Sequence, residues 1–254
     1  MDFSDHFAGT ELDTEVWVPH YLPMWSSRAA SAATYTVADS ELRLTIPPEH
    51  GLWCAEDHSP LRVSGIQSGV FSGEIGSTHG QQPFREGLVV REVQPAQWGW
   101  TPEYGRLEVR ARMDLSTRSM ASAWMVGLEI EPVQCGEICI FEVFGDALEP
   151  GSAAVGMGIH PFRDPALTDE FDAPRLPIDV TEPHTYAADW RPGRVDFLVD
   201  GTQVKTVGQA PGYAMQMMLA VFDFPERAPD TGHVPQLAVD YVRSARNREP
   251  VTAT

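Results

Sequence analysis

The sequence predicts an all-β fold, an antiparallel sandwich or jelly roll built from many short strands. Segments with a helical period are nearly absent, whereas alternating or apolar runs of four to eight residues recur along the chain. Gly, Pro and Asp separate these runs, as turn residues do between short strands. The 254 residues are enough for one large β-rich domain or for two small ones.

The expected strands follow one another with short connections. The sharpest signal is "RVDFLVDGTQVKTV", in which Asp200-Gly201 joins two alternating runs and therefore predicts a β-hairpin. In chain order, the expected strands include 40–46, 87–93, 105–113, 121–130, 137–144, 194–200, 215–222 and 236–243.

No internal repeat or long charged run divides the chain. The Pro- and Asp-rich piece 160–184 has strands on both sides, so we expect a long surface loop rather than a linker. We expect one jelly-roll domain over residues 1–245 and a polar tail over 246–254, and we expect the protein to be a monomer.

The charge balance limits the classes of partner. With 36 acidic and 18 basic residues the formal net charge is -18, which repels nucleic acid and anionic membrane surfaces. No apolar run reaches the roughly 18–20 residues of a membrane span. The first residues lack the basic and apolar regions of a secretory signal. We therefore expect a cytoplasmic protein, or a secreted one whose leader is absent from this chain.

Three cysteines, Cys54, Cys135 and Cys139, are too few for a disulfide framework. Cys135 and Cys139 could supply half of a zinc site only with partners from elsewhere in the fold, because no C-x-x-C or H-x-x-x-H spacing is present.

The stretch "GEICIFEVFG" places Glu137 and Glu142 in an otherwise apolar strand. Residues two apart share a face of a strand, so Glu137 and Cys139 point one way while the isoleucines beside them point into the core. A β-bulge near 140–141 would reset the alternation and return Glu142 to the face of Glu137. Two carboxylates about 5–5.5 Å apart are typical of a retaining glycoside hydrolase, and their repulsion would keep one protonated as the acid. The alternative is an exposed strand face on which the glutamates are simply solvated.

The segment "EICIFEVFG" resembles the Glu-x-Asp-x-x-Glu signature of the laminarinase-like members of glycoside hydrolase family 16, with Cys139 in place of the Asp. Further similarities are "EYGRLEVRARM", "ASAWMVG", "HTYAADWRPGRVDFLVDGTQV", "FAGTELDTEVW" and "LAVDYVR", in the family's order over most of the chain. The resemblance implies a concanavalin A-like β-jelly roll of two antiparallel sheets with an open concave cleft.

The resemblance also implies the catalytic roles. Glu137 would be the nucleophile and Glu142 the general acid/base, acting through a covalent glycosyl-enzyme without a required cofactor. The family's Asp is thought to hydrogen-bond the nucleophile, and the neutral thiol of Cys139 is a weak donor. We expect a working site that is slower or has an acid-shifted optimum. The competing interpretations are a site that has lost catalysis and kept sugar binding, and a redox-sensing thiol.

Aromatic side chains are the expected substrate contacts, because sugar rings stack their C–H faces on them. Trp124 lies in a strand that resembles the family's Trp-containing strand, and Trp98 and Trp100 could both face a groove. His160 follows the catalytic strand as a histidine often does in this branch. Each has a structural alternative, as a core tryptophan or a loop-ordering histidine. Trp25 and Trp53 are further candidates.

Two segments depart from the family pattern. The run 215–225 is bulkier than the family's glycine-rich strand, and 72–103 is longer than usual, so we expect both to shape the cleft. Asp240 matches a position that helps to hold a structural calcium in some members, and oxygen ligands suit that ion.

The expected function is an endo-acting retaining hydrolase of a β-1,3- or mixed β-1,3/1,4-glucan, with a polysaccharide or oligosaccharide as partner. The alternatives are a catalytically weakened or inactive carbohydrate-binding protein on the same fold, and a transglycosylase, which shares the covalent intermediate.

Overall fold

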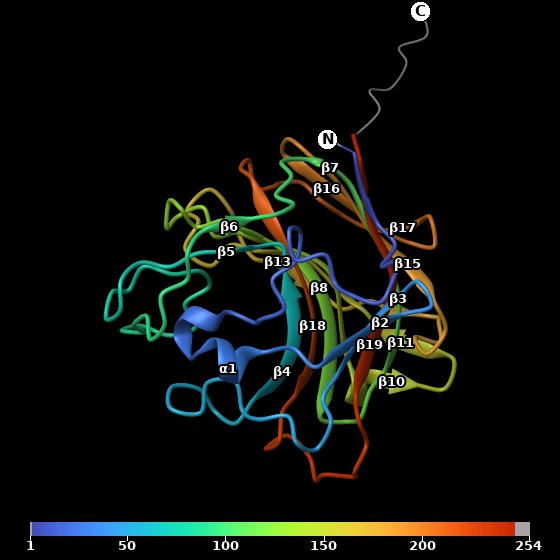
Figure 1. Cartoon of the computed structure of the whole chain (residues 1–254). Coiled ribbons are helices and arrows are strands. Elements are labelled where there is room, and N and C mark those ends of the chain that lie inside the picture. Colours follow the sequence, from blue (N-terminus) through green and yellow to red (C-terminus); the bar gives the residue numbers. More distant parts are fainter. Residues whose placement is uncertain (1, 247–254) are drawn as a thin grey trace, which may run out of the picture.

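Two antiparallel sheets stacked face to face form the body of the computed structural model, which describes residues 2–246 (Figure 1). One is an eight-stranded sheet, in which β1 (Phe3–Asp5) pairs with β19 in addition to the main path. That path runs β17 (Thr202–Val207), β16 (Arg194–Val199), β15 (His184–Arg191), β7 (Gly105–Asp114), β19 (Gln236–Ala245), β3 (Glu41–Thr45) and β2 (Tyr35–Ala38).

The second, six-stranded sheet carries the residues of interest. Its order is β13 (Glu170–Asp172), β12 (Gly156–His160), β9 (Glu137–Phe144), β8 (Ser119–Gly127), β18 (Met215–Asp223) and β4 (Arg62–Gln67). Short elements complete the fold: β5 (Gly69–Val70), β6 (Gln97–Trp98), β10 (Leu148–Glu149), β11 (Ser152–Ala154), β14 (Arg175–Leu176), α1 (Arg28–Ser31) and the 3-10 turns η1 (Pro23–Trp25) and η2 (Gly145–Ala147).

The main hydrophobic core lies between the two sheets. Alternation along each strand sends every second side chain into it, as Leu107 and Val109 of β7 and Leu219 and Val221 of β18 illustrate; all four are fully buried. This arrangement confirms the all-β sandwich that the short alternating runs predict.

The hairpin signal is confirmed as well. Strands β16 and β17 pair directly, and both residues between them have positive φ, 48° at Asp200 and 76° at Gly201. A two-residue turn of this kind matches the twist of the flanking strands. Each of the other expected strand segments overlaps a strand of the structure, with the single exception of 87–93.

The expectation of a strand over 87–93 is wrong. The backbone of this segment bonds to other loops instead of to a strand: Val90 exchanges hydrogen bonds with the turn at 76–77, and the N–H of Arg91 donates to the carbonyl of Met24. Its alternating apolar pattern is nevertheless real, because Leu88 and Val90 are buried in a second cluster.

This second hydrophobic cluster lies on the other face of the six-stranded sheet, which we call the cleft face. Loops from 18–25, 53–61 and 84–90 pack there against side chains of β8 and β18, among them Met120, Trp124, Met218 and Phe222. These loops turn an otherwise open sheet face into the walls of a cavity.

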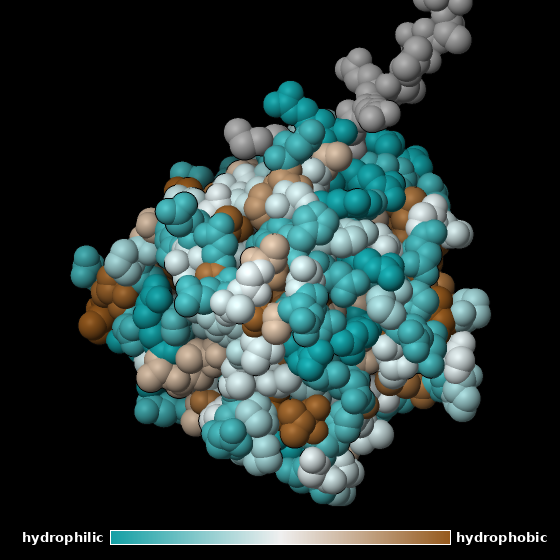
Figure 2. All heavy atoms as spheres, turned by 45° about the vertical axis from the view of Figure 1, so that its right-hand side comes forward, coloured by the Kyte–Doolittle hydropathy of each residue, from teal (hydrophilic) through white to brown (hydrophobic). Residues whose placement is uncertain are grey.

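The face of the molecule in Figure 2 is mostly hydrophilic, with hydrophobic residues scattered over it. None of the helices in residues 2–246 has the length and apolarity that a membrane crossing requires. The division into a domain over 1–245 and a tail over 246–254 stays a prediction, and residues 247–254 of that tail lie outside the described part of the chain.

Candidate active site

A β-bulge interrupts β9 where the sequence predicts one. Phe141 lies opposite Ala123 of β8, but the next pair joins Cys139 to Trp124, so Ile140 is the extra residue. On the other side of β9, the pairing with β12 shifts at the same point. The extra residue changes which side chains share a face.

The bulge brings both glutamates to the cleft face. Ile138 and Val143 point into the core between the sheets, together with the two residues of the bulge. Glu137 and Glu142 line one cavity on the opposite face, and both electrostatically affect Cys139, which lies between them in the strand. The parity reset that the sequence predicts is therefore confirmed.

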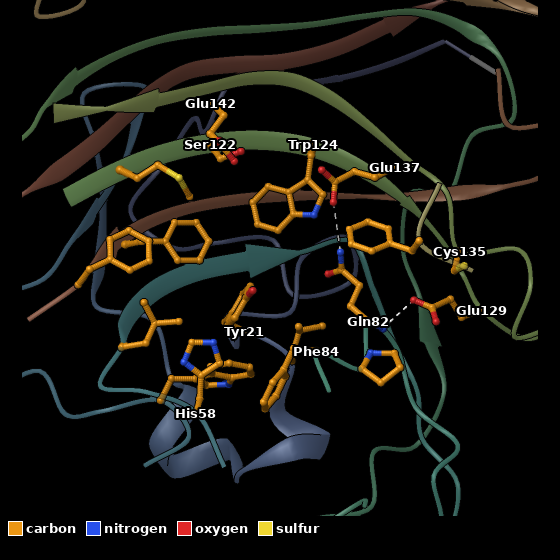
Figure 3. Close-up of a pocket in the computed structure, with 18 of the residues that line it drawn as sticks. Tyr21, His58, Gln82, Phe84, Ser122, Trp124, Glu129, Cys135, Glu137 and Glu142 are labelled. Carbon is orange, nitrogen blue, oxygen red and sulfur yellow. Dashed lines mark hydrogen bonds between the residues drawn. The ribbon is translucent and has the colours of Figure 1, made fainter. Parts of the chain in front are cut away.

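The cavity has a volume of about 300 Å³ and mainly apolar walls (Figure 3). Strands β8, β9 and β18 form its floor, and loops from the first half of the chain form the facing wall. Its lining consists of Tyr21, Leu22, Trp53, His58, Leu61, Gln82, Pro83, Phe84, Met120, Ser122, Trp124, Glu129, Cys135, Glu137, Glu142, Phe162, Arg163, Phe222 and Phe224.

Burial raises the pKa of both carboxyls. Desolvation, followed by the charge of Glu142, raises the pKa of Glu137 to about 8. Desolvation also raises the pKa of Glu142, although His160 and Arg227 oppose the increase. The pair therefore retains a proton near neutral pH.

Cys139 is 1 % exposed and its thiol is neutral. Burial raises its pKa well above the ordinary value, and the charges of Glu137 and Glu142 raise it further. The Sγ atom points toward the carbonyl of Gly156 at 4.0 Å, a weak contact. A hydrogen bond from the side chain of Ser122 opposes the rise in the pKa. The position that resembles the family's Asp thus holds a small uncharged group, and a thiol is only a weak hydrogen-bond donor.

The three candidate tryptophans lie in different places. Trp124 lines the cavity as expected, and its buried Nε1 has no hydrogen-bond partner among residues 2–246. Trp98 is half-buried against Phe71, outside the cavity. Trp100 lies in the main core, 8 % exposed and stacked on Phe3 with ring centroids 4.5 Å apart. This corrects the expectation that Trp100 faces a groove, because its ring packs into the core against Phe3.

His160 lies beside the cavity and not in its wall. It pairs with Glu137 across β12 and β9, so the two side chains share the cleft face. Its Nδ1 lies 2.7 Å from Oδ1 of Asp169, and its ring stacks on Phe171 with a centroid distance of 4.5 Å. These contacts are those of the ordered-loop alternative, and substrate contact at His160 stays a prediction.

Asp240 lies on β19 in the other sheet, where its carboxylate accepts a hydrogen bond from Nε of Arg110 at 2.9 Å. Within the described residues, no group of three or more His, Cys, Asp and Glu side chains could hold a metal ion. The carboxylate of Asp240 thus has an arginine partner, and a structural calcium at this position stays a prediction.

The sequence analysis did not identify several residues of the cavity wall. Tyr21, Phe84, Phe222 and Glu129 come from four separate segments, and their proximity depends on the packing of loops. Two weaker signals pointed to part of this wall: the long segment 72–103 supplies Gln82 and Phe84, and the bulky run 215–225 supplies Phe222 and Phe224. The expectation that both segments shape the cleft is confirmed.

Comparison with known proteins gives one family match. The model of glycosyl hydrolases family 16 matches residues 100–243, a range that includes β9 and both glutamates. No curated protein matches the chain.

Solved structures share the fold over nearly the whole chain. A GlcNAcα1-4Gal releasing endo-β-galactosidase from Clostridium perfringens is 27% identical with a TM-score of 0.79; the match covers 96% of this chain and 62% of that one. The matches to two laminarinases cover almost the full length of those proteins. The one from Flavobacterium sp. UMI-01 is 20% identical (TM-score 0.67, 96% and 99% covered), and the one from Thermotoga petrophila RKU-1 is 16% identical (TM-score 0.66, 97% and 97% covered). The chain thus spans less than two thirds of the Clostridium protein.

Proposed function

This chain belongs to glycosyl hydrolases family 16, and from that premise we propose that it is an endo-acting, retaining β-glycosidase. The observation that carries the proposal is the bulge in β9, which brings Glu137 and Glu142 to the wall of one cavity. Paired carboxyls in an apolar cavity are the groups that glycoside hydrolysis by retention uses.

In the proposed reaction, Glu142 protonates the glycosidic oxygen while Glu137 attacks the anomeric carbon. Glu142 then removes a proton from water, and that water releases the sugar from Glu137 with retained configuration. The bond to the leaving sugar breaks as the bond to Glu137 forms, so no other reactant is needed. His160 and Arg227, which oppose the rise in the pKa of Glu142, favour its return to the ionised state in the second step.

Attack requires Glu137 ionised and Glu142 protonated. The buried pair retains a proton near neutral pH, and a bound sugar whose glycosidic oxygen accepts a hydrogen bond from Glu142 favours this proton on Glu142. Because the two carboxyls titrate as a pair, we expect a bell-shaped dependence of kcat/KM on pH, with both limbs belonging to the pair.

Two substrate classes are supported by different observations. A β-1,3- or mixed β-1,3/1,4-glucan follows from the laminarinase-like signature and from the laminarinases that share this fold. A β-linked galactoside is favoured by the 27% identity with the endo-β-galactosidase over 96% of the chain. The aromatic lining of the cavity, including Trp124 and Phe222, suits the C–H faces of either sugar.

The experiment that tests the proposal is sugar release from laminarin, lichenan, agarose, carrageenan and a glycan bearing GlcNAcα1-4Gal, at pH 4 to 9. Glu137→Gln and Glu142→Gln should each lower kcat by about 10²–10⁴-fold or more. Product analysis by NMR should show the β-anomer first. Retained glycan binding with no turnover on any polymer contradicts the hydrolase and favours a binding protein, whereas longer products in place of hydrolysis indicate a transglycosylase.

A further inference from the structure

Gln82 connects two carboxylates of the cavity. It lies in the long segment 72–103, 55 positions before Glu137, and its side-chain Nε2 donates to Oε2 of Glu137 at 3.5 Å. Its backbone N–H donates to Oε1 of Glu129 at 2.6 Å. Figure 3 shows these two contacts as dashed lines, with Gln82 reaching up from the loop wall toward Trp124 and Glu137.

The backbone of Gln82 is held firmly in place. Glu129 is 2 % exposed, and its second oxygen pairs with the guanidinium of Arg163. The preceding residue, Gln81, is fully buried, and its side-chain amide donates to the carbonyl of Leu128 at 3.2 Å. Gln82 itself has φ of 46°, a left-handed conformation that persists only where the surroundings impose it.

The loop also approaches a neighbouring ring too closely for a larger residue. A Cβ atom at Gly80 would lie 2.7 Å from the ring of Trp25, whose Nε1 donates to the carbonyl of Gln81 at 2.6 Å. These contacts fix the segment, so the side-chain amide of Gln82 is preorganised toward the cavity.

The amide has one group left for a ligand. Oε1 of Gln82 is buried and has no hydrogen-bond partner among residues 2–246. The same holds for Nε1 of Trp124, the neighbouring side chain on the cavity floor. A buried acceptor and a buried donor without protein partners are costly, and a sugar hydroxyl, which both donates and accepts, could satisfy both.

We propose that Gln82 is a positioning and substrate-binding residue: its Nε2 holds the carboxylate of Glu137, and its Oε1 accepts a hydroxyl of the sugar bound against Trp124. This inference rests on the proposed function of the Glu137–Glu142 pair. In this inference the long loop supplies the hydrogen-bond donor to Glu137. Cys139, which lies in β9 itself, is a neutral thiol and therefore only a weak donor.

A donated hydrogen bond favours the ionised form of a carboxyl. Burial and the charge of Glu142 oppose the ionisation of Glu137. Tyr21 and Cys139 are neutral, because burial raises the pKa of each. His160, which lies opposite Glu137 in the sheet, is paired with Asp169. Removing the amide should therefore raise the pKa of Glu137 and reduce the fraction of protein in which Glu137 can attack. A purely structural role for Gln82 predicts neither change.

The test compares Gln82→Met, which removes donor and acceptor at similar volume, with wild type and with Gln203→Met. Gln203 lies on β17, outside the cavity, and its Nε2 donates to Thr206 at 3.0 Å, so it is a matched Gln→Met control. We expect Gln82→Met to lower kcat/KM about tenfold, to raise KM, and to move the acidic limb of the pH profile to higher pH. Gln203→Met should match wild type.

NMR titration of ¹³C-carboxyl-labelled glutamate, assigned with Glu137→Gln, measures the pKa of Glu137 without any substrate. A higher value in Gln82→Met supports the proposal; an unchanged value and an unchanged pH profile overturn it. If Gln82→Met does not fold, Gln82→Glu decides, because a carboxylate there must raise the pKa of Glu137 further. If wild type cleaves no glycan, the proposed function fails while this titration still decides the contact to Glu137.

Discussion

Trp124 of β8 lies directly opposite Cys139 of β9, and the register between the strands slips by one residue immediately after this pair. The thiol therefore lies on the cleft face between two carboxylates, beside the tryptophan that lines the cavity. Two properties of the site depend on this position: the charge of the carboxyl pair and the inertness of the thiol.

Restoring the acid at this position should move the pH profile. In Cys139→Asp a third carboxyl joins Glu137 and Glu142, and mutual repulsion raises the pKa of both. We therefore expect the pH profile of kcat/KM to lie at higher pH in Cys139→Asp than in wild type. The wild-type optimum would then be the acid-shifted one of the two. Cys139→Ser, a neutral control, should keep the wild-type profile. An unchanged profile in Cys139→Asp would show that the charge at this position does not tune the pair.

The three thiols should be unreactive in the folded protein. Cys54, Cys135 and Cys139 are all buried, and burial raises the pKa of each. A thiolate is the reactive form, so modification by a disulfide reagent at pH 7.5 should be more than about tenfold slower than for free cysteine. In denaturant all three should react. Fast native modification mapped to Cys139 by mass spectrometry would instead support a redox-sensing role.

Glu137 should destabilise the fold at alkaline pH. Its pKa is about 8 in the folded protein and lies near the ordinary 4.5 in the unfolded chain. Between these values the folded state binds more protons, so the stability that this group contributes is present below about pH 4.5 and is lost as pH rises through 8. Glu137→Gln should therefore raise Tm by roughly 4 °C or more at pH 8.5 and leave it nearly unchanged at pH 4.5. Differential scanning calorimetry measures both, and an equal shift at the two pH values would contradict the raised pKa.

A buried ion pair should hold the end of β18. Asp223 is 1 % exposed and accepts hydrogen bonds from Arg118 at 2.6 Å and Arg62 at 2.8 Å. Asp223→Asn removes the carboxylate that these two largely buried guanidinium groups share, and it leaves Arg118 only the exposed carboxylate of Asp230. We expect a cost of about 3–5 kcal/mol, or roughly 10 °C in Tm.

The control for this substitution is Glu149→Gln. Glu149 is 60% exposed and pairs with Arg175, which is 42% exposed, so this ion pair lies at the surface and contributes little. Thermal denaturation should leave the Tm of Glu149→Gln within about 2 °C of wild type. Equal losses in the two variants would show that burial does not determine the value of these pairs.

The sequence alone determined the parts of the molecule that depend on local patterns. Alternating apolar residues fixed the strands, Asp200-Gly201 supplied the positive φ angles of the hairpin, and the spacing of Glu137 and Glu142 required a bulge if both were to share a face. Each of these is a relationship between residues close in the chain, so the period of the sequence carries it.

Only the tertiary structure decided which distant residues meet. Gln82, Glu129 and Glu137 converge because loops pack over the cleft face, and nothing in their separate segments encodes that contact. The same packing placed Trp100 in the core against Phe3 and gave Val90 backbone partners in loops instead of in a sheet. Burial then set the protonation of the glutamate pair, because the cost of desolvating a charge depends on everything that surrounds it.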